Sequence, residues 1–406
     1  MNILWITTQL PCRRSGGQVR QYYLLKHLCK RHNLTVLSLV QPAERGEIEA
    51  LQRLNARVIT EKFVPPQAKG KWSNRFLSWS QLLFDRQPHH VRTYPLDGLH
   101  QLLCGVLAEK NPDIVHFDDL SVVSLSENIG SLPWVLTEHN VESYKHDRLR
   151  IHASTPTRRL AGWIESKKLY YWERKWVRRS SACIAMSDID ANLLQELAPS
   201  NSIVVIPNGV ETDYFTPPMY HNSSRTDLIF FGRLSYAPNS DALNYFCQDI
   251  FPIIRSRIPE INLRIIGSDA PAEIVALEKL PGVTYTGFVP DIRPHLWSAA
   301  VCVVPLRSGG GTRLKILEAM AAGLPIVSTK IGAEGLQLRD GQDLFIEDDP
   351  IKFASSVLRL LQDPYQQERL RKSGQRTVSN LYDWGTIAPK QELVYETIID
   401  RFTREQ

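Results

Sequence analysis

The residues best suited to carry out chemistry follow a short apolar run near position 300. The run, residues 301–304, has the pattern of a strand that is buried on both faces. Three glycines, Gly309, Gly310 and Gly311, let the backbone that follows approach a ligand without side chains in the way. Thr312 is a residue type that caps helices, so we expect a helix to start there. This order predicts a place where a ligand meets the backbone.

The first two turns of the expected helix carry charges that suit a phosphorylated ligand. Exposed N–H groups at a helix start, together with Arg313 and Lys315, form an anion site. Glu318 lies three residues beyond Lys315, so both side chains can point at the same object, and its carboxylate can accept hydrogen bonds from sugar hydroxyls. A nucleoside diphosphate with its ribose fits this set. The alternative is an ordinary strand–turn–helix unit in which Lys315 and Glu318 form an ion pair in solvent.

The stretch GGGTRLKILEAMAAGLPIVST, residues 309–329, resembles the donor-binding motif of the retaining GT-B glycosyltransferases of family 4. Members of that family commonly carry two glutamates eight positions apart, and Glu318 matches the second, which implies that it holds the donor ribose. Gly310 stands at the position of the first. The carboxylate that usually contacts the donor hexose is therefore absent, and the motif does not identify the hexose.

Two further segments of the second half resemble parts of the family's donor site. Arg233 directly follows the apolar run 228–232, and the resemblance places it on the donor phosphates. The family's lysine five or six residues later is missing, because that region is Pro238-Asn239, so we expect Lys315 to substitute for it. Gly287, Phe288 and Val289 match the family's loop that cradles the nucleotide base through backbone groups. Backbone contacts of this kind do not discriminate UDP, GDP and ADP.

The first loop of the chain is a second candidate for contact with the donor. A strand at residues 2–8 and a helix at residues 21–30 flank a loop that contains Gly16 and Gly17. In doubly wound folds this loop lies outside the carboxyl end of the strand, where ligands bind. It lacks the GxGxxG pattern, so a nicotinamide cofactor is not supported. Two glycines needed only for the turn are the alternative; the resemblance implies donor and acceptor contacts from Gly16, Gly17 and Arg20.

A histidine follows the strand predicted at residues 134–137. A side chain at the carboxyl end of a strand faces the ligand side of such a sheet, although a histidine there also serves as an ordinary hydrogen-bonded residue. The TEHNVE context resembles the family segment whose histidine approaches the donor sugar. We therefore expect His139 to be catalytic, with Asn140 and Glu142 as weaker candidates on the acceptor side.

Composition sets the class of protein. The 406 residues are 43% hydrophobic and 22% charged, which is typical of a globular chain with two cores. The net charge of +5 is mildly basic and far from the extreme of nucleic-acid-binding proteins, but it is compatible with an anionic substrate or membrane surface. The six cysteines are scattered, which favours reduced thiols, a cytoplasmic location and no metal site. We see no signal peptide and no membrane span.

Two stretches combine basic and aromatic residues. The first covers residues 61–94. The second, residues 144–179, holds eleven basic and three acidic residues together with three tryptophans and three tyrosines. Such helices bind the surface of an anionic membrane, which would place the protein peripherally on its inner face. The alternative is a solvated helix face. No nucleic-acid-binding motif accompanies the charge, so we expect no nucleic-acid partner.

Strands and helices alternate twice around a proline-rich joint. This pattern predicts an α/β protein, and the resemblance implies the GT-B fold, two doubly wound Rossmann-like domains facing across a cleft. We expect an acceptor-side domain at residues 1–206, a linker at 207–226, a donor domain at 227–383, and a last helix at 384–406 that crosses back to the first domain.

The implied reaction is transfer of a hexosyl group from a nucleoside diphosphate sugar to a hydroxyl of a glycan or lipid-linked acceptor, with retention. Arg233, Lys315 and the loop amides would stabilise the departing diphosphate, so we expect neither a metal nor another cofactor. A role in bacterial polysaccharide or cell-envelope glycan synthesis fits. The alternatives are a GT-B nucleotide-sugar epimerase and a non-catalytic relative that binds nucleotide sugar or a protein partner. The oligomeric state is left open.

Overall fold

The computed structural model divides into two compact units. The first comprises Met1–Pro207 and Ile387–Gln406, and the second comprises Asn208–Thr386. The residues whose structure is described are 1–13, 16–41, 44–63, 85, 87–109, 111–151, 155–217, 227–309 and 311–405.

The first unit is built on a seven-stranded parallel sheet with strand order β3-β2-β1-β4-β5-β6-β7. Apolar runs such as Ile3–Ile6 are buried on both faces, as parallel strands require. The order reverses between β1 and β4, so ligands are expected outside the carboxyl ends of the strands near this point. The strands are β1 (Asn2–Thr7), β2 (Asn33–Val40), β3 (Arg57–Lys62), β4 (Ile114–Phe117), β5 (Trp134–Glu138), β6 (Ala182–Ala185) and β7 (Ile203–Val205).

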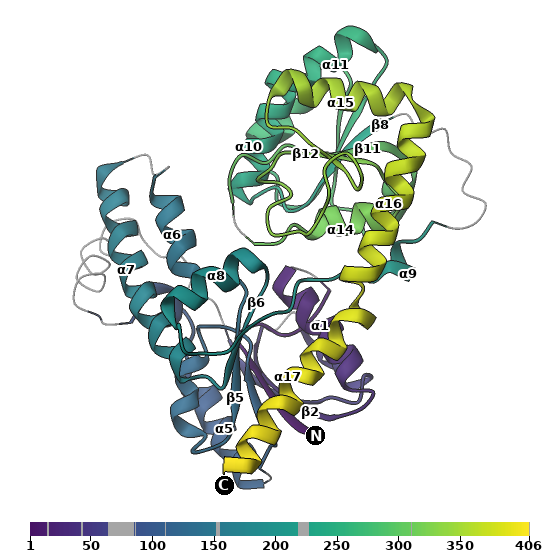
Figure 1. Cartoon of the computed structure of the whole chain (residues 1–406). Helices are drawn as coiled ribbons and strands as arrows, with labels where there is room; N and C mark the ends of the chain where they lie inside the picture. Colours follow the sequence, from purple (N-terminus) through teal and green to yellow (C-terminus); the bar gives the residue numbers. More distant parts are fainter. Residues whose placement is uncertain are drawn as a thin grey trace. The chain divides into compact units, whose positions relative to one another are not determined.

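Helices cover both faces of this sheet, with α1 and α17 on one side and α5, α7 and α8 on the other (Figure 1). The predicted cap of α8 is confirmed, because Ser187 Oγ accepts a hydrogen bond from the Asp190 N–H. The helices are α1 (Gly16–Leu28), α2 (Arg45–Gln52), α4 (His89–Arg92), α5 (Asp97–Glu109), the 3₁₀ helix η2 (Val123–Asn128), α6 (Glu142–Ile151), α7 (Pro156–Arg179), α8 (Asp188–Leu197) and α17 (Trp384–Glu405).

The second unit has a six-stranded parallel sheet of order β10-β9-β8-β11-β12-β13, and its order reverses between β8 and β11. The strands are β8 (Asp227–Phe231), β9 (Leu263–Ile266), β10 (Val283–Gly287), β11 (Ala299–Val304), β12 (Ile326–Ser328) and β13 (Phe345–Ile346). The helices are α9 (Thr212–Phe215), α10 (Ala237–Tyr245), the π-helical turn η3 (Phe246–Ile250), α11 (Phe251–Arg257), α12 (Ala272–Val275), the 3₁₀ helix η4 (Ala276–Lys279), α13 (Arg293–Ser298), α14 (Leu314–Ala321), α15 (Pro350–Gln362) and α16 (Pro364–Tyr382).

The segment expected to be a linker is partly folded onto the second unit. The Val210 N–H donates to the Tyr382 carbonyl at 2.8 Å, and Thr212 Oγ1 donates to Asp383 at 2.5 Å. Trp297 Nε1 donates to the Phe215 carbonyl at 2.8 Å. Residues 208–217 therefore belong to the second unit, and residues 218–226 lie outside the described residues.

Candidate functional site

The glycine loop after β11 needs glycine for steric reasons. Gly309 and Gly311 have φ values of 113° and 73°, in the left-handed region that favours glycine. A Cβ atom at Gly309 would lie 2.9 Å from the guanidinium of Arg313, which itself donates to the Gly311 carbonyl at 2.7 Å. The loop thus closes tightly on Arg313. Gly310 lies outside the described residues.

The helix after this loop starts later than the sequence suggested. α14 begins at Leu314, and the prediction that Thr312 caps it is wrong, because Arg313 occupies the N-cap position and provides no side-chain cap. The Thr312 hydroxyl is instead buried and has no hydrogen-bond partner among the described residues. A loop constrained by two positive-φ glycines delays the first helical residue.

Lys315 is held at the end of β8 by an asparagine. Its Nζ donates to Asn239 Oδ1 at 2.9 Å and lies 4.1 Å from the centre of the Phe230 ring. Asn239 Nδ2 in turn donates to the Arg233 carbonyl at 2.7 Å. Asn239 stands in the region where the family carries its lysine. Its contact with Lys315 holds the Lys315 amine near the end of β8, close to where that lysine would be. The alternative of a surface ion pair between Lys315 and Glu318 is not what the structure shows.

Burial shifts the titration of both charged residues of α14. It lowers the pKa of Lys315 to about 7, with a further lowering by Arg313 and opposition from Cys302 and Glu318. Burial likewise raises the pKa of Glu318 to about 7, while the Lys315 charge lowers it. Gly232 makes room for this arrangement, because a Cβ atom there would lie 3.1 Å from Lys315 Nζ. A bound anion would therefore change the protonation of Lys315 and Glu318.

The other residues predicted to bind the donor differ in exposure and in the contacts that they make. The side chain of Arg233 is 69% exposed and contacts Ser235 Oγ at 3.1 Å and Asp269 at 3.6 Å. Arg233 therefore contributes only its backbone carbonyl to the contacts of Asn239 and Lys315. Gly287 has a φ of 78°, and the Phe288 ring beside it is 74% exposed. Val289 packs against the core of the second unit. An exposed aromatic ring next to a tight turn can stack on a planar ligand.

In the first unit, His139 follows β5 and is oriented by a buried carboxylate. Its Nε2 lies 3.1 Å from Asp118 Oδ2 and 3.1 Å from the Asp118 carbonyl oxygen. Burial lowers the pKa of His139, but the Asp118 charge and hydrogen bond outweigh it and raise the pKa. Burial raises the pKa of Asp118, and the two neighbouring histidines overcome this and hold it far below its usual range. With Nε2 facing Asp118, Nδ1 is the ring nitrogen left for a ligand.

A second layer of contacts fixes Asp118. His116 Nε2 lies 3.3 Å from Asp118 Oδ1 and 2.8 Å from Thr137 Oγ1. Its Nδ1 is hydrogen-bonded to the Tyr395 hydroxyl of α17. The sequence reasoning missed Asp118, His116 and Tyr395. Asp118 carried a usable signal, because it directly follows β4 and its neighbour β5 ends at Glu138; Tyr395 carried none.

A polar cavity of about 270 Å³ lies beside His139. It brings together Gly17, His139, Asn140 and Glu142, as the sequence suggested, and its lining is completed by Gln9, Gln21, Asp119, Leu120 and Glu138. Gly16 is the first residue of α1 and does not line the cavity. Arg20 does not line it either: its side chain is fully buried and Nη1 donates to the Pro207 carbonyl at 2.7 Å.

No cluster for a metal was found in the described part of the chain, where no three His, Cys, Asp or Glu side chains are grouped to hold an ion. None of the helices in the described ranges is long and apolar enough to cross a membrane. Most of the first basic and aromatic stretch, residues 64–84 and 86, lies outside the described residues.

Two sequence families cover most of the chain. The one described as Glycosyltransferase Family 4 matches residues 14–214, and the one described as Glycosyl transferases group 1 matches residues 225–363. The chain belongs to glycosyltransferase family 4. Its two doubly wound sheets are the GT-B architecture predicted from the sequence, which is confirmed.

Two relatives of this glycosyltransferase carry the names of different enzymes. The phosphatidyl-myo-inositol mannosyltransferase of Mycobacterium tuberculosis is 29% identical over 316 residues, which is 74% of this chain and 77% of that protein. The glycogen synthase of the same organism is 26% identical over 322 residues, covering 73% of this chain and 72% of that protein.

Solved structures share the fold over nearly the whole glycosyltransferase. HepE of Anabaena, in complex with UDP and glucose, gives a TM-score of 0.71 at 16% identity and covers 98% of this chain and 100% of that chain. Sucrose-phosphate synthase of Thermosynechococcus elongatus gives 0.72 at 15% identity, with 98% and 99% covered. At these identities the likeness shows the fold alone.

Proposed function

We propose that this glycosyltransferase moves a hexosyl group from a nucleoside diphosphate sugar to a hydroxyl of a glycan or lipid-linked acceptor, with retention. The observation that carries the proposal is the position of Lys315, held by Asn239 at the end of β8 beside the glycine loop. A partly buried cation beside the glycine loop and Glu318 matches a diphosphate followed by a ribose. The complex of HepE with UDP and glucose supports this donor class.

The chemical problem is the charge that develops on the departing diphosphate. The bond from the anomeric carbon to the diphosphate oxygen breaks, and the acceptor oxygen bonds to the same face of that carbon. The acceptor proton passes to the leaving phosphate. Lys315 and the loop amides stabilise the new negative charge in a site shielded from water, without a metal, and Arg233 contributes when its exposed side chain turns to the phosphates. His139, oriented by Asp118, acts at the sugar being transferred.

A calorimetric titration with UDP, GDP and ADP in the presence of EDTA tests the donor assignment. We expect one nucleotide to bind and Glu318→Ala to weaken it about tenfold or more, because the ribose loses its acceptor. Glu334→Ala, in the loop after β12, is the control for a carboxylate elsewhere in the second unit. Absence of binding by all three nucleotides would contradict the donor site, and binding that requires a divalent ion would contradict metal independence.

Product analysis tests the reaction. Incubation of the cognate nucleotide sugar with acceptor should release nucleoside diphosphate and give a glycoside with the anomeric configuration of the donor, measured by NMR. An epimerised nucleotide sugar in the absence of acceptor would instead indicate an epimerase. Tight nucleotide-sugar binding without any product would indicate a non-catalytic protein.

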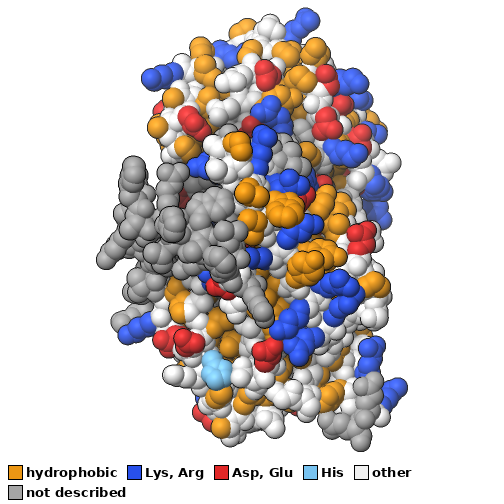
Figure 2. Space-filling model, turned by 90° about the vertical axis from the view of Figure 1, so that its left-hand side faces the viewer, with side chains coloured by type: hydrophobic (Ala, Val, Ile, Leu, Met, Phe, Trp, Pro, Cys, Tyr) orange, Lys and Arg blue, Asp and Glu red, His pale blue; other side chains and the backbone are white. Residues whose placement is uncertain are grey.

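We further propose a role in bacterial polysaccharide or cell-envelope glycan synthesis, with the protein bound peripherally to an anionic membrane. The face of the first unit that carries α6 and α7 supports membrane binding, since basic and hydrophobic side chains are interleaved there (Figure 2).

A further inference from the structure

The cavity beside His139 contains hydrogen-bond acceptors that the protein itself does not satisfy. Glu138 is 2% exposed and Gln21 is 4% exposed, and Oε1 of each has no hydrogen-bond partner among the described residues. The Gln21 amide is fixed, because its Nε2 donates to Thr7 Oγ1 at 3.0 Å. Buried acceptors of this kind are normally paired, so two of them lining one cavity indicate a ligand that donates hydrogen bonds.

The charges around the cavity are mostly negative. Asp119 and Glu142 line it together with Glu138. Glu173 of α7 and Asp190 of α8 also act electrostatically on Glu138, and Glu138 acts on Cys183 of β6. Two cations beside the cavity are already engaged, since Lys145 pairs with Glu142 at 2.8 Å and His139 with Asp118 at 3.1 Å. A phosphate or carboxylate entering here would meet mostly like charge.

Glu138 is suited to bind a neutral group. Burial, followed by the charges of Glu173, Glu142, Asp119 and Asp190, raises the pKa of Glu138 well above its usual value. The raised pKa favours the protonated carboxyl group, which can both donate and accept a hydrogen bond. Hydroxyl groups, which also do both, are complementary to it.

The size of the cavity suits a small ring. Its volume of about 270 Å³ is below the range of roughly 300–1,000 Å³ that is common for drug-sized ligands. Leu120 and the backbone of Gly17 give it a less polar wall, against which the C–H face of a sugar ring can pack.

We propose that this cavity binds one neutral sugar ring of the acceptor through its hydroxyl groups, with Glu138 and Gln21 as the specificity-determining side chains, and that it excludes phosphorylated and carboxylated rings. The proposal rests on the function proposed above. It defines the acceptor group that lies beside His139 as a polyol, whatever larger glycan or lipid carries it.

Ligand-observed NMR on the full chain, saturated with the nucleotide found by calorimetry, tests this. The probes are methyl glucoside, methyl mannoside and methyl galactoside, each against glucose 6-phosphate and glucuronate. We expect at least one neutral glycoside to bind and both anionic sugars to bind at least tenfold more weakly. Glu138→Ala and Gln21→Ala should each weaken the neutral glycoside about tenfold or more, with the native fold checked by thermal unfolding.

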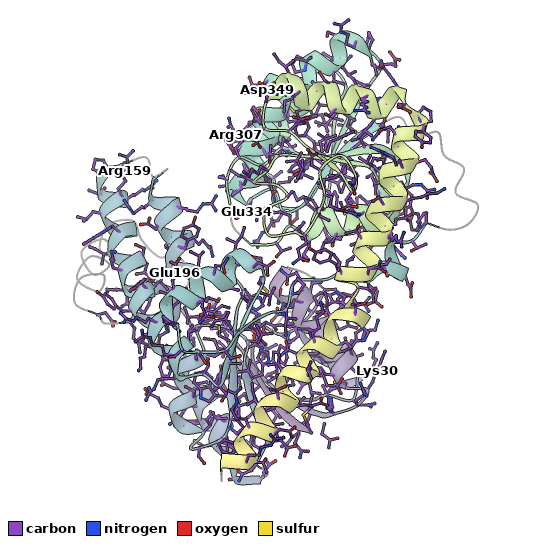
Figure 3. All side chains as sticks on the ribbon, in the orientation of Figure 1. Lys30, Arg159, Glu196, Arg307, Glu334 and Asp349 are labelled. Atoms are coloured by element: carbon purple, nitrogen blue, oxygen red, sulfur yellow. The ribbon has the colours of Figure 1, made fainter. Side chains whose placement is uncertain are left out.

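Glu138→Gln is the decisive variant. The amide reproduces the acceptor and the donor of a protonated carboxyl group, so affinity for the glycoside should stay within about threefold of the wild type. Glu196→Ala, an exposed carboxylate on α8 of the same unit (Figure 3), is the matched control and should change nothing. An affinity unchanged in Glu138→Ala would overturn the proposal, as would equal binding of the anionic sugars.

The failure of this proposal can be separated from failure of the proposed function. Slow transfer of the hexosyl group to water, measured as nucleotide release without acceptor, reports donor chemistry alone. If release occurs but no neutral glycoside binds, the cavity holds only water and the acceptor proposal is wrong while the function stands. If a glycoside binds but no nucleotide sugar is turned over, the function is wrong.

Discussion

At the scale of single residues, Lys315 connects the donor site to pH. The pKa of its amine is about 7 because of burial, far below the usual value of 10.5. Above pH 7 the free protein therefore carries a neutral Lys315, whereas a bound diphosphate favours the charged form. Binding then takes up a proton, so affinity should fall as pH rises above 7, by up to about tenfold per pH unit for one proton.

The measurement is calorimetry with the cognate nucleotide between pH 6.5 and 8.5. Lys315→Met should reduce both the affinity and its pH dependence, with Lys330→Met, an exposed lysine after β12, as the control. Glu318, whose pKa burial raises to about 7, also gains a proton next to an anion, so a residual slope of the same sign should remain. A wild-type affinity independent of pH would contradict this assignment.

Asp118 should matter to catalysis through His139. In Asp118→Asn the charge that raises the pKa of His139 is lost, so that pKa should fall and the His139 ring should lose its fixed tautomer. We expect kcat to decrease roughly 10²–10⁴-fold, the range for a misplaced proton-transfer group. NMR titration of the ring checks the direction of the shift, and His139→Ala combined with Asp118→Asn should be no slower than His139→Ala alone.

These residues show what the sequence could predict. Lys315, Glu318 and His139 belong to motifs with a recognisable local context, and the substitution of Lys315 for the absent lysine could be proposed from the family resemblance. Asp118, Glu138 and Asn239 act through contacts between separate strands and helices. A carboxylate or amide at the end of a strand is common, and only the fold shows that Asp118 lies beside His139, or Asn239 beside Lys315.

At the scale of elements, Gly309 in the loop before α14 should tolerate no side chain. Gly309→Ala forces a Cβ atom to 2.9 Å from Arg313 Nη2 at a φ of 113°. We expect destabilisation of about 1–3 kcal/mol and weaker nucleotide binding. The matched control is Gly46→Ala in α2, where a Cβ atom meets open space and should stabilise by about 0.5–1 kcal/mol. Chemical denaturation and calorimetry measure both, and equal behaviour of the two variants would contradict the prediction.

Helix α17 is anchored to the first unit by polar contacts that no periodicity reveals. The Tyr395 hydroxyl reaches His116, and Glu392 pairs with Arg31 at 2.9 Å and His32 at 2.8 Å. Tyr395→Phe leaves the buried His116 Nδ1 without its partner, so the free energy of unfolding should fall by about 1–3 kcal/mol. Phe402→Ala on the same helix removes apolar packing only and serves as the comparison by denaturation. Full stability in Tyr395→Phe would mean that another group satisfies His116.

The elements themselves were largely predictable, because buried parallel strands are apolar runs that alternate with helices. Three features were not. Strand β3, Arg57–Lys62, is only partly buried at the edge of its sheet and is mostly polar, so it lacks such a run. The π-helical turn at Phe246–Ile250 and the late start of α14 depend on packing and on backbone strain, which composition does not encode.

At the scale of the whole molecule, much of the positive charge is concentrated on one pair of helices. Residues 144–179 hold eleven basic and three acidic residues, against a net charge of +5 for the chain. Part of this charge is neutralised internally, since Lys175 and Arg179 both contact Glu127 at 3.1 Å. Along α7, large apolar side chains remain exposed, namely Leu160 at 52%, Trp163 at 46% and Tyr171 at 66%. Arg159 lies at the outer end of this pair (Figure 3).

The exposed face of α7 predicts salt-sensitive binding to anionic membranes. This face carries Leu160, Trp163, Lys167 and Tyr171, which recur at intervals of three or four residues. Aromatic and basic side chains together favour the interface of an anionic bilayer. Co-sedimentation with phosphatidylglycerol vesicles should be strong at low salt and fall markedly at about 0.5 M salt, where charges are screened within a few ångströms. Trp163→Ala with Tyr171→Ala should weaken it at every salt concentration, whereas Tyr365→Ala, 79% exposed on α16, should not. Equal binding to phosphatidylcholine vesicles would show that charge plays no part, and unchanged binding of the double variant would show that α7 is a solvated face.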